Sequence, residues 1–195
     1  MEFRILNAAP LKDYREACRV TLGMRPDLNN FPSLPFDEVE YWIKQIVANH
    51  STLRSVRFRM IAEAPKSVIM QIIRATKGHP QPEVQSSRPD WVGKERSGDP
   101  YELKLFMQDH TAESFVEMAK QRLCMRTEGK TREFMQKAVE ALKQSGEPFL
   151  VAVGYCCKPY CEWYGSCPEI KSCGKSPNLA SWIIGEYKIK MAKNP

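Results

Sequence analysis

Between residues 55 and 73 the spacing of apolar residues changes, and this change constrains the fold more than any other feature. The alternation over residues 55–61 places Phe58 and Met60 on one face, which predicts a half-buried strand. Pro65 suits the first turn of a helix, and the stripe that follows predicts that helix: Val68, Ile69, Ile72 and Ile73. A strand that runs straight into an amphipathic helix predicts an α/β (α+β) domain, a small mixed sheet flanked by helices.

The other periodic segments are consistent with one such domain. They predict strands over residues 2–6 and 149–155, and helices over about 11–22, 36–49, 111–127 and 130–145. The Pro- and Gly-rich stretch 76–100 predicts a long loop, which in a compact domain is usually functional or disordered. We therefore expect one domain over residues 1–155, with the Cys-rich segment 156–195 belonging to it.

The charge balance restricts the class of partner. The chain has 29 Lys and Arg against 23 Asp and Glu, a net charge of +6, without a long basic block. This mild excess suits an anionic small molecule or a solvated basic surface, and a nucleic-acid partner is not expected. No apolar run is long enough to span a bilayer and the first residues do not resemble a signal peptide, so we expect a cytoplasmic protein without a membrane partner.

An arginine pair continues the apolar stripe of the helix 111–127. Phe115, Met118 and Ala119 form that stripe, and the next positions along it are Arg122 and Arg126. Burying an arginine is unfavourable unless an anion or an acceptor meets it, so this spacing suits an anion site. A structural ion pair, or a side chain that reaches back to solvent, would explain the same spacing.

A second polar group lies on the helix after Pro65 and in the loop beyond it. Gln71 and Arg74 share a helix face, and the loop carries Ser86, Ser87 and Arg88. An amide can recognise the edge of a flat heterocycle, and a guanidinium can bind phosphate with two hydrogen bonds. The alternative is an ordinary solvated face and loop. Of the histidines, His79 falls in this loop and His110 would begin the next helix.

Taken in order, these segments resemble the flavin-dependent thymidylate synthase family. The resemblance touches most of the chain, and the chain would be a short, divergent member. It is carried by the opening strand and helix, the segment Asn49-His50-Ser51-Thr52, the helix with Gln71 and Arg74, the Ser86-x-Arg88 end of the loop, Arg122-Leu-Cys-Met-Arg126, Cys161, Cys167-Pro-Glu and Cys173-Gly.

The resemblance implies an activity and its cofactors. Members transfer a one-carbon unit from methylenetetrahydrofolate to carbon-5 of dUMP, giving dTMP, with reduced FAD as hydride source and NADPH as its reductant. It also implies a homotetramer whose sites lie between subunits. The alternatives are methyl or hydroxymethyl transfer to another pyrimidine nucleotide, or a non-catalytic homologue that binds a nucleotide or nucleic acid, for which Trp91 beside Arg88 and Lys94 would be suitable.

Residue roles follow from the same resemblance. The substrate-binding residues would be Gln71, Arg74, Gln85, Ser86, Ser87, Arg88 and Arg122, with Arg122 also catalytic because it would stabilise charge on the activated pyrimidine. The flavin-binding residues would be His50, Thr52, Arg74 and Thr76.

Several positions depart from the family pattern. Ala75 and Thr76 stand where the family has His and Arg, and Arg54 and Ser55 stand where a Glu is expected. The helix before Arg122 carries Thr111, Glu113 and Glu117 in place of Asn and Arg, and acidic groups repel a pyrophosphate. Nucleotide binding is thus better supported than flavin binding.

Seven cysteines in an intracellular chain indicate free thiols or metal ligands rather than disulfides. Cys157, Cys161, Cys167 and Cys173 lie close enough in sequence to hold Zn²⁺ tetrahedrally, although no paired Cys-x-x-Cys knuckle is present. The alternative is a set of reduced cysteines in a packed segment. Cys18 and Cys124, each on a predicted helix, are expected in the core.

Overall fold

The structure is a computed structural model that describes residues 3–6, 11–22, 37–75, 82–86, 93 and 98–193. Its elements, in chain order, are β1 (Phe3–Leu6), α1 (Leu11–Thr21), α2 (Glu38–Ala48), the 3₁₀ turn η1 (Ser51–Ser55), β2 (Arg57–Pro65), α3 (Lys66–Ala75), β3 (Glu83–Val84), β4 (Leu103–Thr111), α5 (Ala112–Arg122), α6 (Gly129–Lys143), α7 (Pro148–Cys156), α8 (Tyr160–Tyr164) and α9 (Leu179–Lys193).

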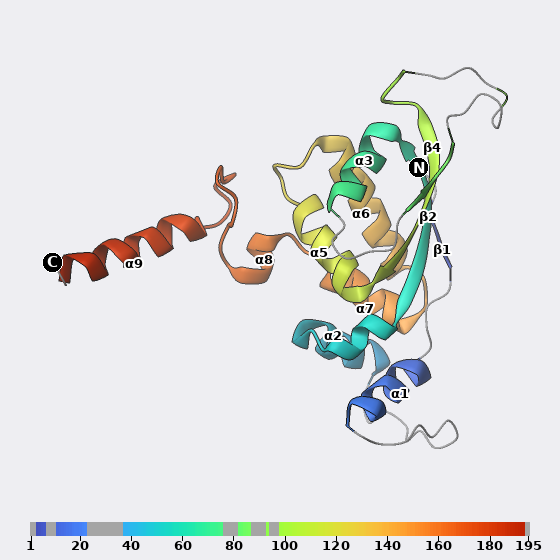
Figure 1. Cartoon of the computed structure of the whole chain (residues 1–195), viewed down its shortest axis with the longest axis horizontal. Coiled ribbons are helices and arrows are strands. Elements are labelled where there is room, and N and C mark those ends of the chain that lie inside the picture. The colour runs from blue at the N-terminus through green and yellow to red at the C-terminus, as the bar shows by residue number, and fades with distance from the viewer. Residues whose placement is uncertain are drawn as a thin grey trace.

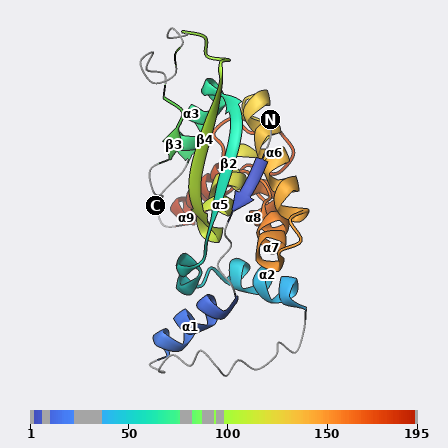
Figure 2. The ribbon, with the colours of Figure 1, turned by 90° about the vertical axis from the view of Figure 1, so that its right-hand side faces the viewer.

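A four-stranded sheet forms one layer, and helices cover one of its faces. The strand order is β1-β2-β4-β3, and every described pair is antiparallel. The helices α3, α5, α6 and α7 lie on one side of the sheet (Figure 1), and Figure 2 looks onto the opposite side. The expected α+β architecture with a small sheet is therefore present, but the sheet is antiparallel rather than mixed.

The pairing of β2 with β4 is the longest in the sheet and sets its two faces. Along β2 the buried residues alternate, with Phe58 and Met60 facing the helices, as the sequence predicts. On the opposite face Arg59 donates two hydrogen bonds to Asp109, at 2.6 and 2.9 Å. The face toward the helices contributes to the core.

An aromatic cluster joins the helices to the sheet. Trp42 of α2 and Phe149 of α7 have ring centroids 4.8 Å apart, and Phe58 of β2 lies 6.4 Å from Phe149. All three side chains are buried. Edge-on aromatic contacts of this kind add to the free energy gained by burial.

Helix α7 corrects the prediction of a strand over residues 149–155. Glu147 accepts hydrogen bonds from the backbone N–H groups of Phe149 and Leu150, and Pro148 occupies the first turn. These are strong helix-start features. Helices α2 and α6 both pack against α7, so residues on more than one side of α7 are buried. A helix buried on several sides is apolar nearly all round, and its sequence therefore lacks the helical period of apolar residues.

Strand β4 is a second correction. No strand is predicted from the sequence there, and His110 is expected to start a helix, yet His110 is the eighth residue of a nine-residue strand and is buried. The buried positions of β4 include Lys104, Gln108 and His110, so polar residues occupy the face that should be apolar. The two-residue alternation of hydrophobicity is thereby lost.

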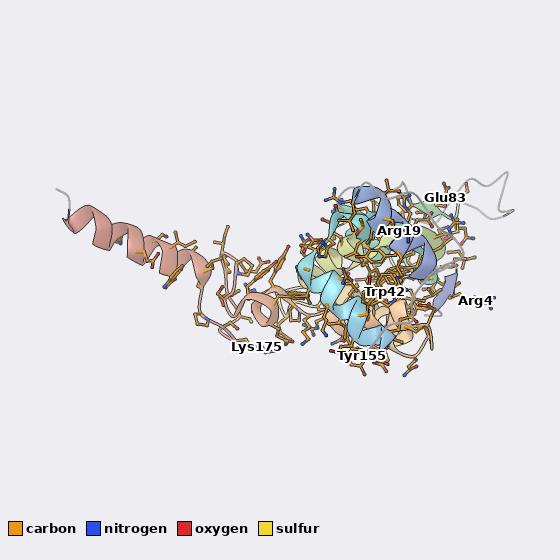
Figure 3. The ribbon with its side chains drawn as sticks, turned by 90° about the horizontal axis from the view of Figure 1, so that it is seen from below. Arg4, Arg19, Trp42, Glu83, Tyr155 and Lys175 are labelled. Carbon is orange, nitrogen blue, oxygen red and sulfur yellow. The ribbon has the colours of Figure 1, made fainter. Side chains whose placement is uncertain are left out.

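Helix α9 extends away from the body of the molecule. Figures 1 and 3 show it beyond α8, at the far side of a connecting segment that includes Lys175. Trp182, Ile183 and Ile184 of α9 are exposed in this arrangement. In the described part of the chain, no helix combines the length and the apolar character needed to cross a membrane.

We expect Phe149→Ala to destabilise the protein by about 3–5 kcal/mol, because it removes a buried ring from the centre of the aromatic cluster. Tyr155→Ala, on the same helix but 55% exposed, is the matched control and should change stability by less than about 1 kcal/mol. Urea unfolding monitored by circular dichroism measures both. Equal losses in the two variants would contradict the observed orientation of α7.

Candidate functional site

The end of α5 meets the middle of α3 at a cleft of about 580 Å³. There the Arg122 guanidinium donates a hydrogen bond to the backbone oxygen of Gln71, with Nη2 and the oxygen 2.7 Å apart. A volume of this size lies within the range of small-molecule sites. Its lining residues are Gln71, Gln121, Arg122, Cys124, Arg126, Thr127, Glu128, Tyr160, Pro168 and Glu169.

Arg122 carries a partly buried charge that no carboxylate neutralises among the described residues. Its Nε is buried without a hydrogen-bond partner, and its single described bond is to the neutral carbonyl of Gln71. Burial lowers the pKa of Arg122 from its ordinary value, but a guanidinium remains protonated. A desolvated cation whose donors are incompletely used binds an anion or an electron-rich oxygen strongly.

The other charged residues of the cleft differ in whether they already make hydrogen bonds within the protein. Glu128 accepts hydrogen bonds from the backbone N–H groups of Lys130 and Thr131, at 3.0 and 2.8 Å, at the start of α6. These bonds lower the pKa of Glu128, so its carboxylate is ionised and occupied. Arg126 and Glu169 are exposed on the rim. The depth of the cleft is therefore cationic, and its rim has both signs.

The structure brings Gln71 and Arg122 together but separates some other predicted substrate residues from them. Arg74 is exposed on α3 and does not line the cleft. The Gln85 amide oxygen accepts from the Leu105 N–H at 3.1 Å, so this side chain caps the strand edge instead of facing a ligand. Ser86 is half-buried beside it. Ser87, Arg88, Thr76 and His79 lie outside the described residues.

The predicted flavin residues His50 and Thr52 lie at η1, near the opposite end of α5 from Arg122. The Cys18 thiol donates to the Thr52 hydroxyl, with the two atoms 3.5 Å apart, which joins η1 to α1. His50 is exposed and provides no side-chain cap to η1. Within one chain, these two residues do not reach the Gln71–Arg122 cleft.

Two departures from the family pattern contact each other. Arg54 of η1 donates to Glu113 in the first turn of α5, with 3.0 Å between Nε and Oε2. Thr111, a third departure, caps α5 in a reciprocal pair of hydrogen bonds with Ser114. These residues therefore have internal roles: one pair joins η1 to α5, and the other begins α5.

Lys120 holds α8 against α5. Its ammonium donates to Glu117 at 2.6 Å and to the Tyr164 hydroxyl at 3.1 Å, and it lies 4.5 Å from the centre of the Trp163 ring. The side chain is only 7% exposed. Tyr160 of α8 donates to the same carboxylate group and also lines the cleft. The Lys120 contacts therefore position part of the cleft wall.

The cysteines fall in two places. Cys161, Cys167 and Cys173 line a second cavity next to the cleft, together with Cys124. Cys157 is buried at the end of α7 and lines a different depression, with Lys143 and Leu123. In the described part of the chain, no group of three His, Cys, Asp or Glu residues is arranged to hold a metal ion. Of the expected core cysteines, Cys18 packs against the core, while Cys124 is half-buried.

Several cleft residues are absent from the sequence interpretation. Gln121, Thr127, Tyr160, Pro168 and Glu169 line the cleft without having been predicted as site residues. The neighbouring positions 121 and 127 could have been inferred from their nearness to Arg122 and Arg126. Residues 160, 168 and 169 come from the Cys-rich segment, and nothing in their spacing indicates that this segment folds over α5.

Comparison with known proteins finds no family model and no curated protein that matches this chain.

We expect Lys120→Ala to destabilise the protein by about 1–3 kcal/mol, because it leaves Glu117 and the Tyr164 hydroxyl without their shared cation. Lys137→Ala is the matched control: it removes a similar pair with Glu133, but one that is half-exposed on α6, and should cost less than about 0.5 kcal/mol. Denaturant unfolding measures both losses, and limited proteolysis should show earlier cleavage around α8 in Lys120→Ala alone. Unaltered stability in that variant would contradict this docking role.

Proposed function

We propose that the Gln71–Arg122 cleft binds a pyrimidine nucleotide and that the protein transfers a one-carbon unit from methylenetetrahydrofolate to carbon-5 of its ring, with dUMP as the substrate. The observation that carries the proposal is the partly buried Arg122 guanidinium, which has unused donors and no described carboxylate partner. It lies on the wall of a cleft large enough for a nucleotide. The ordered resemblance supplies the identity of the nucleotide.

Arg122 acts by stabilising charge that develops on the ring. Carbon-5 becomes nucleophilic when electron density from the ring nitrogen is delocalised onto carbon-5 and the carbonyl oxygens. A guanidinium held in a fixed position lowers the energy of that negative charge. The hydrogen bond to the Gln71 carbonyl holds the guanidinium in place at 2.7 Å, so little reorganisation is needed. The exposed Arg126 on the rim is suited to the nucleotide phosphate.

The described residues do not fit a flavin as the resemblance implies. The Thr52 hydroxyl already accepts a hydrogen bond from the Cys18 thiol. At the start of α5, where the family has cations that bind the flavin pyrophosphate, this chain has Glu113, and the nearby Arg54 is paired with it. The implied homotetramer would place residues of one copy near the cleft of another, but it would not change the sign of Glu113. FAD with NADPH remains the hydride source that the resemblance implies.

The poor flavin fit favours a product that needs no hydride. The carbon carried by methylenetetrahydrofolate has the oxidation level of formaldehyde. Transfer to carbon-5 with addition of water gives a hydroxymethyl group and tetrahydrofolate, and the proton from carbon-5 is released; no electrons are exchanged with a third reactant. Methyl transfer needs two further electrons. The Arg54–Glu113 ion pair is the observation that favours the redox-neutral variant.

Arg122→Gln should weaken dUMP binding by about 10- to 150-fold, equivalent to about 1.5–3 kcal/mol, because a charge-assisted hydrogen bond becomes a neutral one. Arg57→Gln, which removes an exposed arginine at the start of β2, is the control and should leave the affinity unchanged. Titration calorimetry measures the affinities, and circular dichroism checks the fold. Equal dUMP affinity in wild type and Arg122→Gln would remove Arg122 from the nucleotide site.

Tritium release from dUMP labelled at carbon-5 tests the reaction itself. With methylenetetrahydrofolate, wild type should release tritium and Arg122→Gln should lose nearly all of that activity. Mass spectrometry of the product distinguishes methyl from hydroxymethyl by one oxygen atom, and a requirement for FAD and NADPH accompanies only the former. If the protein binds dUMP but releases no tritium with or without FAD and NADPH, it is the non-catalytic nucleotide binder.

A further inference from the structure

The face of the sheet that is turned away from the helices has apolar residues in its middle. We call it the open sheet face, because in the described part of the chain no helix covers it (Figures 1 and 2). Leu103 and Leu105 of β4 are 54% and 53% exposed there, and Ile61 of β2 and Met107 of β4 are half-buried. An antiparallel sheet with one face in water normally has polar residues on that face. The open sheet face departs from this pattern.

Strand β4 has the reverse of the expected polarity. Lys104 and Gln108 are buried toward the helices, whereas Leu103, Leu105 and Met107 occupy the outward positions. Burial of a polar side chain in place of an apolar one is unfavourable, and so is exposure of a row of apolar side chains. The sequence of β4 therefore suits a sheet whose outer face is also covered.

The strand register sets four outward residues in one row across the sheet. Ile61 lies opposite Arg4 of β1 on one side and opposite Met107 of β4 on the other. Met107 in turn lies opposite Glu83 of β3. Residues directly opposite each other point to the same face. From β1 to β3, the row therefore has a cation, two apolar residues and an anion.

The next row along the strands also has both signs of charge. Arg59 of β2 lies opposite Asp109 of β4, and these two side chains are 42% and 27% exposed. Hydrogen bonding from Arg59 lowers the pKa of Asp109, so the carboxylate is ionised at neutral pH. A cation and an anion thus lie side by side next to the apolar centre of the open sheet face.

We propose that the open sheet face packs against the same face of a second copy and forms a symmetric dimer. A two-fold axis parallel to the strands, between β2 and β4, exchanges the two edges of the sheet. It places Arg4 over Glu83 of the second copy, and Ile61 over Met107 of the second copy. Sheets packed in this aligned way lie about 10 Å apart, with their side chains interdigitated.

The order of charges favours a second copy over an unrelated protein. The same axis places Arg59 over Asp109 of the second copy, so the Arg59–Asp109 pairs of the two chains form a network of alternating charge. A symmetric interface must be complementary to itself, and both rows meet that requirement. An unrelated partner would have to supply the same order of charges independently.

This interface leaves the nucleotide cleft accessible. Gln71 and Arg122 belong to α3 and α5, which lie on the other side of the sheet (Figure 1). In the homotetramer that the resemblance implies, the sites lie between subunits, so the open sheet face is a different surface. The dimer therefore does not rest on the proposed nucleotide function.

Analytical ultracentrifugation of the full-length protein over a range of concentrations tests the interface. Wild type should form a dimer, or a larger assembly built from such dimers. Ile61→Thr combined with Met107→Thr should raise the dissociation constant by about tenfold or more, because both copies lose the apolar centre. Threonine is compatible with a strand, so the monomer should stay folded.

Val84→Thr is the matched control for the threonine variant. Val84 is 41% exposed on β3, but it lies opposite Phe106 and therefore belongs to the helix-facing side of the sheet. This change should leave the dissociation constant as it is in wild type. Circular dichroism checks that each variant is folded.

Charge reversal identifies the residues that face each other. Arg4→Glu alone and Glu83→Arg alone should each weaken the dimer, because like charges then face each other across the interface. The two changes together should restore most of the affinity. Within one chain the two positions are three strand spacings apart, about 14 Å, so solvent and salt screen their direct interaction. Recovery of affinity therefore reports a contact between copies.

Four outcomes would overturn the proposal. The wild-type protein is a monomer at every concentration; the threonine variant assembles as wild type does; or the double charge reversal fails to recover the affinity lost in the single variants. The fourth is a monomeric wild type that sediments with phosphatidylglycerol vesicles while the threonine variant does not. That result would assign the open sheet face to a lipid surface.

Discussion

The antiparallel pairing of β2 with β4 is the constraint on which the cleft depends. Its register runs from Arg57 opposite Thr111 to Pro65 opposite Leu103, and each strand continues directly into a helix. Because the strands are antiparallel, α3 begins at one end of the sheet and α5 at the other, and both return over the same face. The eleven residues of α5 span about 16 Å. That length carries Arg122 to the middle of α3, where Gln71 receives it.

The departures from the family pattern are most informative when taken as pairs. A lone Glu113 would only argue against a flavin phosphate, and a lone Arg54 would be an exposed cation. Their contact at 3.0 Å means that the two charges compensate each other across the η1–α5 junction. A solvent-exposed pair contributes little stability, so its effect is chiefly on what can bind there. The Arg122 end of α5 lacks such compensation among the described residues, and because of this contrast we propose nucleotide binding at Arg122 and not flavin binding at η1.

Sequence reasoning succeeded where one face of an element is apolar and the other polar. Strand β2 and helices α1, α2, α3 and α6 have that pattern, and their predicted positions are confirmed to within a few residues. It failed for α7, which is buried by α2 and α6 on several sides, and for β4, whose buried face carries Lys104, Gln108 and His110. At the site, the resemblance grouped Gln71 with Arg122, but the spacing of apolar residues alone did not predict their contact. The approach of Tyr160, Pro168 and Glu169 to the cleft could not be predicted either, because it depends on how α8 docks on α5.

The short connection after α5 links the two cavities physically. Arg122 ends the helix, and Cys124, two residues further on, lines both cavities. Two hydrogen bonds tie α8 to the same helix: Tyr160 of α8 donates to Glu117, and Lys120 of α5 donates to the Tyr164 hydroxyl. The Cys-rich segment is thus held at Lys120 and at its own closing hydrogen bonds around Cys167, with the Cys173 turn left as its exposed part. The residues that line both cavities, Cys124, Tyr160, Pro168 and Glu169, therefore join the Cys-rich segment to the cleft.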